Sequence, residues 1–155
     1  MTRSGRDLPQ LLGEARRWFE DGMLAALEAE GVPAVTPPQV QLFAALDEDG
    51  TTVAELARRT GVTRQTVHQA VHFLVAAGLL EQVPDPSSAR QRLIRRTPAG
   101  LHAHDRARRA LGRLEAELAD RVGQGAVAAL RAALESPEAP WSEPPAAPAD
   151  PRFRP

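Results

Sequence analysis

The chain has 155 residues, of which 43% are apolar and 25% are charged, so the expectation is one soluble globular domain. It contains no cysteine, which excludes disulfides, thiol nucleophiles, thiol redox switches and cysteine-based zinc sites. No apolar run reaches the ~18 residues of a membrane span, and the first residues lack the apolar core of a secretory signal. We therefore expect a cytoplasmic protein.

The net charge of −1 conceals an uneven distribution along the chain. Residues 1–50 carry 4 arginines and 9 acidic residues. Residues 51–109 carry 10 arginines and 4 acidic residues, and residues 110–155 carry 5 arginines and 7 acidic residues. Only the middle segment is basic, so it can bind a polyanion while the acidic flanks keep the chain soluble. Lysine is absent, which together with abundant alanine, leucine, glycine and proline suggests a bacterial source with GC-rich genes.

The helical spacing of apolar residues predicts a long first helix that ends at Gly31, with Gly22 as a candidate kink. A second helix starts at Thr36, the expected N-cap, with proline in its first turn and Gln39 at the capping-box position. We expect this helix to stop at the acidic turn 47–50, which we interpret as a solvated turn.

Two short helices follow, separated by a tight step. Thr52 opens the first helix and Gly61 ends it, while Thr63 opens the second helix, which ends at Gly78. The step between them combines a glycine that is free to adopt positive φ, an apolar plug at Val62 and an N-cap. This combination is what a helix-turn-helix requires.

The second helix of this motif separates its residues by face. One stripe is apolar and consists of Val67, Ala70, Val71 and Leu74. The other face spans roughly 140° and carries donor-rich side chains without an acid: Arg64, Gln65, His68, Gln69 and His72. Arginine can bind guanine and glutamine can bind adenine in the major groove of DNA. Hydroxyls and free N–H groups at Thr63 and Thr66 suit phosphate.

Every surface helix has a polar face, so the absence of negative charge is the informative feature. No aspartate or glutamate occurs from Val62 to Leu80, whereas an ordinary exposed face mixes both signs of charge. The pattern therefore favours a helix that reads DNA.

A β-hairpin is predicted next, with strands at Leu79–Val83 and Gln91–Arg96 around a turn at Pro84–Ser88. Its second half concentrates positive charge at Arg90, Arg92, Arg95 and Arg96. An arginine-bearing hairpin can enter a minor groove, although the same charges would also protect a strand edge from aggregation. Beside a reading helix, we favour DNA contact.

Long helices are predicted after the hairpin. Thr97-Pro98 starts a helix with a leucine stripe to Val122, and a final helix ends at Pro137. Such a stripe must be buried, which favours a homodimer, although the first and last helices could also pack on each other within one chain. The last 20 residues hold 7 of the 14 prolines and predict a disordered tail.

Three segments, Ala54–Val67, Leu74–Glu81 and Asp85–Gly100, resemble in order the helix-turn-helix, first wing strand and wing signature of MarR-type (multiple antibiotic resistance regulator) transcription factors. The resemblance implies a mainly α fold with a small β-hairpin wing, that is, a winged helix-turn-helix domain flanked by long dimerisation helices. The implied boundaries are a dimerisation helix in 1–35, the DNA-binding lobe in 36–97, dimerisation helices in 98–135 and the disordered tail in 136–155.

The resemblance also implies a homodimer on a pseudo-palindromic operator and a ligand-responsive repressor. Members of this family often bind small aromatic effectors between the dimer helices and the DNA-binding lobe. Arg90 falls where the family has its minor-groove arginine. Ser88 and Ala89 depart from the wing signature, and Arg96 replaces a usual leucine, which suggests an altered contact at the base of the wing.

Other chemistries find little support. His68 and His72 have chelating spacing but no carboxylate nearby in sequence, so we expect no metal. Zinc-protease, nucleophile-elbow, phosphate-loop and dinucleotide motifs are missing from the sequence, so we expect neither an enzyme nor a cofactor. The alternative is a winged-helix adaptor that binds protein, which would need an apolar or acidic exposed helix. The candidate DNA-binding residues are Thr63, Arg64, Gln65, Thr66, His68, Gln69, His72, Arg90 and Arg92.

Overall fold

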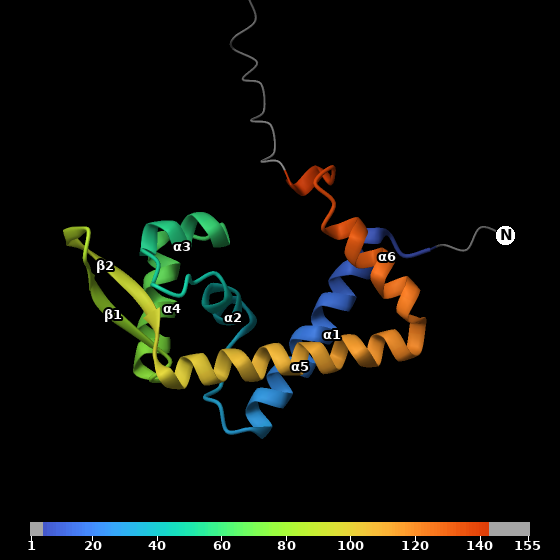
Figure 1. Cartoon of the computed structure of the whole chain (residues 1–155), viewed down its shortest axis with the longest axis horizontal. Helices are drawn as coiled ribbons and strands as arrows, with labels where there is room; N and C mark the ends of the chain where they lie inside the picture. Colours follow the sequence, from blue (N-terminus) through green and yellow to red (C-terminus); the bar gives the residue numbers. More distant parts are fainter. Residues whose placement is uncertain (1–4, 143–155) are drawn as a thin grey trace, which may run out of the picture. The chain divides into compact units, whose positions relative to one another are not determined.

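The computed structural model describes residues 5–142. Its elements follow in the order α1 (Leu8–Ala29), α2 (Pro37–Ala44), α3 (Val53–Thr60), α4 (Arg64–Ala76), β1 (Leu80–Asp85), β2 (Ser88–Arg96), α5 (Pro98–Val122), α6 (Gln124–Leu134) and a short 3₁₀ helix (Pro140–Ser142) (Figure 1). The predicted fold class, mainly α with a small hairpin, is confirmed. No helix within the described part is long and apolar enough to cross a membrane.

The chain divides into two compact units, residues 1–114 and 115–155. The first contains α1 to α4, the hairpin and most of α5. Its core lies between the helix-turn-helix and the start of the hairpin, where six side chains are almost fully buried: Leu56, Val67, Val71, Leu74, Leu80 and Ile94. The apolar stripe predicted for α4 therefore faces the core, with Ala70 only partly buried.

The predicted helix starts are confirmed by their caps. Thr36 and Gln39 form the reciprocal capping box of α2, and the Thr36 N–H donates to Gln39 Oε1 over 2.9 Å. The hydroxyls of Thr52 and Thr63 accept hydrogen bonds at the first turns of α3 and α4. Gly31 adopts φ of +74° just after the end of α1, as expected for a helix stop.

The expected end of α2 was wrong. The helix stops at Ala44, several residues before the predicted acidic turn, and residues 45–50 form an irregular connection. The Asp47 N–H donates to Thr51 Oγ1 over 2.9 Å, and Leu46 is buried although it lies outside the helix. A side-chain hydrogen bond from four residues ahead thus replaces the helical one.

Gly22, the candidate kink, does not break α1. The helix is continuous through it, and a Cβ placed there would lie 2.8 Å from Leu114 Cδ2 of α5. Gly22 therefore permits the close approach of two helices. Position 100 is tighter still, since a Cβ there would lie 2.0 Å from the Leu79 carbonyl oxygen, and only glycine fits.

The hairpin is longer than predicted. β1 and β2 pair antiparallel from Leu80 opposite Arg96 to Pro84 opposite Arg92, then shift register so that Asp85 pairs with Ser88. The turn is consequently shorter than the predicted one, and residues 89–91 form a bulge in β2. Thr51 adds a single antiparallel bridge to Ile94, a pairing that the sequence analysis missed.

In α5, the leucine stripe is not what the chain buries. Ala103, Ala110 and Ala119 are buried, whereas Leu101 and Leu111 are exposed. In α6, no residue is buried. Small residues and the half-buried Leu114 thus form the side of α5 that packs on the core, and other large apolar side chains remain uncovered within the single chain.

The prediction of a disordered tail from Ser136 differs from the structure as far as Ser142. Residues 140–142 form a 3₁₀ helix, and Trp141 Nε1 donates to the Leu134 carbonyl over 3.1 Å. The indole N–H thereby satisfies one of the free carbonyls at the end of α6. Residues 143–155, which complete the predicted tail, lie outside the described residues.

Candidate nucleic-acid interface

The direction of α4 is set at the step after α3. Gly61 adopts φ of +70° and its N–H donates to the Ala57 carbonyl over 3.0 Å, which ends α3 in a left-handed turn. Thr63 then caps α4, because its hydroxyl accepts from the Thr66 N–H over 3.1 Å. The two helices are adjacent in the first unit, and their core side chains Leu56 and Val67 are fully buried.

Val62 does not act as the apolar plug that the sequence suggested. It is 39% exposed, so the space between α3 and α4 is filled by residues within the helices instead. The turn itself therefore needs only the glycine and the N-cap, and residue 62 lies at the surface beside the start of α4.

The outer face of α4 agrees with the predicted pattern. All five donor-bearing side chains are exposed: Arg64, Gln65, His68, Gln69 and His72. Within residues 5–142, none of them forms an ion pair or a side-chain hydrogen bond. Their donors and acceptors are thus available to another molecule. The two histidines belong to no group of three or more possible metal ligands in the described part.

The first turn of α4 holds fewer free donors than expected. The Thr66 N–H is already bonded to Thr63, and the two threonine hydroxyls lie 2.9 Å apart. The first helical hydrogen bond joins the Val67 N–H to the Thr63 carbonyl, so the N–H groups of Arg64 and Gln65 have no helical acceptor. The free backbone donors therefore belong to Arg64 and Gln65.

The four arginines of the hairpin fall into two classes. Arg90 and Arg92 are exposed and form no ion pair within the described residues. Arg95 is also exposed, but its guanidinium donates to Glu81 Oε1 on β1 over 2.7 Å. Arg96 is buried. The predicted cluster therefore contributes two free cations, both on the bulged half of β2.

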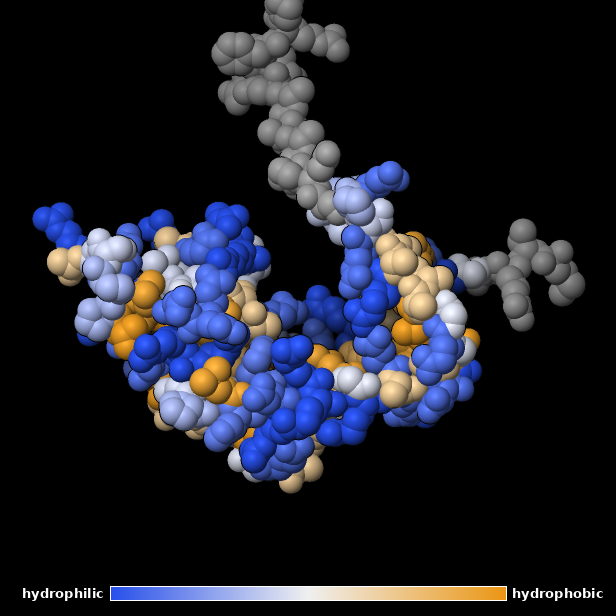
Figure 2. Space-filling view, in the orientation of Figure 1, coloured by the Kyte–Doolittle hydropathy of each residue, from blue (hydrophilic) through white to orange (hydrophobic). Residues whose placement is uncertain are grey.

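The tip of the hairpin is held by a local turn. Asp85 Oδ1 accepts from the Ser87 N–H over 2.8 Å and from the Ser87 hydroxyl over 2.7 Å. These hydrogen bonds from Ser87 lower the pKa of Asp85. They also engage the Asp85 carboxylate itself. Figure 2 shows both hydrophilic and apolar side chains at this end of the hairpin.

Arg96 is the residue whose role the sequence analysis left open. It is only 9% exposed, and its Nη2 donates to the carbonyls of Phe43 over 2.7 Å and Leu46 over 3.0 Å. Its Nε has no partner. Burial lowers the pKa of Arg96, against the opposing pull of the Asp47 and Glu48 carboxylates. The altered contact expected at the wing base is thus a buried link from β2 to the end of α2.

A second network braces α3 and engages one acid of the predicted solvated turn: residues 47–49 are all exposed, but Asp47 is bound to Arg59. Arg59 donates to both carboxylate oxygens of Asp47, over 2.8 and 2.9 Å, and also to Glu55 and the Ala45 carbonyl. Hydrogen bonds from Arg58 and Arg59 lower the pKa of Glu55 to about 2, and those from Arg59 lower the pKa of Asp47. Asp47 and Glu55 are therefore both paired with arginine.

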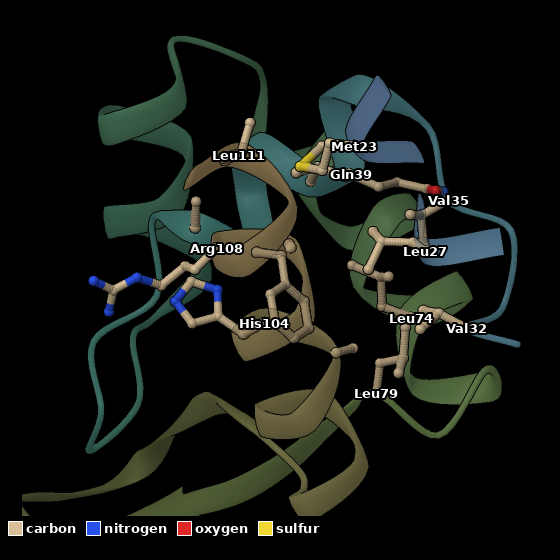
Figure 3. A pocket seen from close by; sticks show the side chains of 15 residues that line it. Met23, Leu27, Val32, Val35, Gln39, Leu74, Leu79, His104, Arg108 and Leu111 are labelled. Atoms are coloured by element: carbon tan, nitrogen blue, oxygen red, sulfur yellow. The ribbon is translucent and has the colours of Figure 1, made fainter. Parts of the chain in front are cut away.

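Away from the exposed face of α4, α1, α2 and α5 surround a small cavity of about 90 Å³ (Figure 3). Its walls are formed mainly by apolar side chains such as Met23, Leu27 and Phe43, and the Arg108 guanidinium points away from them. His104 lies at the wall with its ring 6.1 Å from that of Phe43. Burial lowers the pKa of His104, and the charges of Arg96 and Arg108 lower it further.

One exposed side chain on α4 escaped the sequence analysis. Phe73 is 44% exposed, although Leu74 beside it is buried. It was missed because a phenylalanine at the edge of an apolar stripe is ordinarily assigned to the core.

Comparisons with known proteins agree with this architecture. Residues 35–91 match the model of the MarR family. Among solved structures, the chain is similar to wild-type MarR from E. coli in its apo form, with 21% identity over 84% of this chain and 96% of that one, at a TM-score of 0.65. It is also similar to RV1404 from Mycobacterium tuberculosis, with 21% identity, 86% and 94% coverage and a TM-score of 0.66.

A third similar structure is CouR from Rhodococcus jostii RHA1 bound to p-coumaroyl-CoA, with 20% identity, 88% and 94% coverage and a TM-score of 0.68. At these identities the likeness is one of fold. No curated protein matches the chain.

Proposed function

Because this chain carries a winged helix of the MarR type, we propose that it is a transcription regulator that binds duplex DNA as a homodimer in the cytoplasm. The observation that carries the proposal is the exposed, acid-free outer face of α4, whose polar groups are unoccupied within residues 5–142. A helix of this kind can enter the major groove, where base edges present hydrogen-bonding groups and phosphates supply negative charge.

Each part of the proposed interface has its own role. Arg64, Gln65, His68, Gln69 and His72 face the base edges of the major groove, with Thr63 and Thr66 near a phosphate. Arg90 and Arg92 enter the adjacent minor groove or contact its phosphates, because they are the hairpin arginines without a partner. Arg95 and Arg96 are excluded from this role, since Glu81 and the end of α2 already bind them.

The homodimer is supported by apolar surface that the single chain leaves uncovered. Exposed large apolar residues occur on the three helices outside the lobe: Leu8, Leu11, Leu12, Leu101, Leu111, Val122, Leu130 and Leu134. Apolar side chains are visible on the surface of α6 (Figure 2). Exposed apolar surface of this kind marks association sites, and a symmetric pair of chains is the common solution. We therefore assign 1–35 and 98–135 to dimerisation and 36–97 to DNA binding.

We further propose that the regulator is a repressor that responds to a small aromatic effector. The apolar cavity between α1, α2 and α5 supports this role. At about 90 Å³ it is smaller than the ~150 Å³ cavities that hold benzene, so a ring would have to displace side chains in the wall. A ligand that favours the displaced arrangement would shift the population of dimers away from the one that fits the operator.

The test is a selection of DNA sequences from a random pool by the purified full chain at a stated salt concentration. A regulator recovers a motif with two inverted half-sites. An adaptor that binds protein recovers none, and its affinity for DNA stays equal across sequences. Sedimentation of the complex then gives the number of chains per operator, for which we expect two.

A further inference from the structure

Phe73 is an apolar side chain on the polar side of α4. Among the phenylalanines that the structure describes, Phe43 is buried and Phe19 is half-buried, whereas Phe73 is 44% exposed. It has no aromatic or cation–π partner within residues 5–142. An exposed phenyl ring forgoes the gain of burial and can recover it only by contact with another molecule.

The helix places this ring in line with two candidate DNA contacts. Gln65, Gln69 and Phe73 are spaced by four residues, so they form a row that turns by roughly 40° per step around α4. All three side chains are exposed, and the row starts opposite the buried stripe of α4 at Gln65 and reaches the edge of that stripe at Phe73. Phe73 therefore extends the outer face by one helical turn beyond Gln69.

The chemistry of this row suits A·T base pairs. A glutamine amide matches the N6 and N7 groups of adenine, and thymine presents a C5 methyl, the only apolar group on the major-groove edges of the bases. Cytosine would call for a carboxylate, and none occurs from Val62 to Leu80. One turn of helix advances about 5.4 Å and a base pair about 3.4 Å, so the ring would lie one or two base pairs beyond the Gln69 contact.

We propose that Phe73 is a specificity residue that contacts the C5 methyl of a thymine and biases each half-site toward A·T pairs. This inference rests on the proposed DNA binding and adds the base composition that the helix selects. A protein partner fits the surroundings less well, because Gln69 and His72 beside the ring are polar and a protein-binding patch is larger and continuous. Val75, the other large exposed apolar residue of α4, lies on its opposite flank.

The experiment removes the methyl group and the ring separately. Single thymines of the selected operator are replaced by deoxyuridine, which lacks only the C5 methyl, and dissociation constants are measured at one salt concentration. For the wild-type chain we expect one position in each half-site where the replacement weakens binding by about threefold to fivefold. The Phe73→Ala variant binds the thymine operator more weakly by a similar factor and no longer distinguishes thymine from deoxyuridine at that position.

Two controls separate the possible failures. Val75→Ala, which also truncates an exposed apolar side chain of α4 to alanine, keeps the wild-type response to deoxyuridine, and circular dichroism confirms that both variants fold. If no thymine replacement affects the wild-type chain, or if Phe73→Ala responds as the wild type does, the inference is overturned while operator binding stands. If the selection recovers no motif at all, the proposed function fails and this inference fails with it.

Discussion

Arg96 contacts Phe43 in two ways, since its guanidinium lies 5.2 Å from the centroid of the phenyl ring and also donates to the Phe43 carbonyl over 2.7 Å. Arg96 ends β2, and Phe43 lies in the last turn of α2, where carbonyls lack helical partners. A cation at a helix C-terminus is electrostatically favourable. Because the Phe43 ring also lines the cavity, one residue pair joins the base of the hairpin to the cavity wall.

We expect Arg96→Lys to lower the free energy of unfolding by about 1–2 kcal/mol. An ammonium group cannot stack on the ring and reach both carbonyls with the geometry of a guanidinium. Urea denaturation at matched protein concentration measures this free energy. Arg92→Lys, at an exposed position of the same strand, should change the free energy of unfolding by less than about 0.5 kcal/mol. Equal effects of the two substitutions would show that the buried link does not stabilise the fold.

Arg90→Ala should weaken operator binding by about tenfold or more and leave the dimer intact. The reason is that Arg90 is exposed and has no partner within residues 5–142. Arg95→Ala is the matched control, because Arg95 lies on the same strand but is held by Glu81. Fluorescence anisotropy titrations at one salt concentration compare them. A wing that does not touch DNA would give the same affinity for Arg90→Ala as for the wild type.

Gln65→Ala should relax base preference more than it lowers affinity for unrelated DNA. The side chain is exposed on the outer face of α4 and carries no charge, so its loss removes hydrogen bonds to bases but no phosphate attraction. Repeating the selection with the variant measures its base preference, and titration of an unrelated duplex measures its affinity for unrelated DNA. Recovery of the unchanged motif would contradict a base-reading role for Gln65.

Glu55 should titrate near pH 2, because Arg58 and Arg59 both donate hydrogen bonds to its carboxylate. The folded pKa of Glu55 is below its usual value of 4.5. The stability that the ionised carboxylate confers is therefore complete above pH 4.5 and is lost as the pH falls to about 2. Carbon-13 NMR of the carboxyl measures this pKa directly. In Arg58→Gln we expect the pKa to rise toward 4.5, and a value near 4.5 in the wild-type chain would refute the network.

Leu130→Asp should weaken dimerisation by about 100-fold or more, because it places a charge on apolar surface that we assign to the interface. Leu130 is exposed, and α6 buries no residue within the single chain. Ala128→Asp introduces the same charge at an exposed position on another side of α6 and should leave the dimer largely intact. Analytical ultracentrifugation over a range of concentrations distinguishes them. An unchanged dimer in Leu130→Asp would remove α6 from the interface.

The sequence predicted the local features of the fold well. The caps at Thr36, Thr52 and Thr63 and the two faces of α4 depend on neighbours within one or two turns, so their signals lie in short stretches of sequence. For the same reason the exposure of the five donor-bearing side chains of α4 could be foreseen. The exposed Phe73 could not, since an aromatic residue at the edge of a stripe suits either side.

What the sequence could not predict depends on partners that are distant along the chain. Arg96 binds carbonyls 50 and 53 residues away, and Arg95 binds Glu81 on the opposite strand. Four arginines within seven residues therefore looked equivalent, although only Arg90 and Arg92 remain free in the described part. The pairing of Asp47 just after α2 shares this origin only in part, because Arg59 is 12 residues away whereas its other partner, Thr51, is four residues ahead.

The glycine at position 100 has a mechanical consequence. Backbone meets backbone where the first turn of α5 passes Leu79, which directly precedes β1, and the Thr97 N–H donates to the Leu79 carbonyl over 3.1 Å. Because no side chain lies between these two backbone segments, a tilt of the N-terminal end of α5 also displaces Leu79 and the start of β1. The orientation of α5 is thereby coupled to the position of the wing.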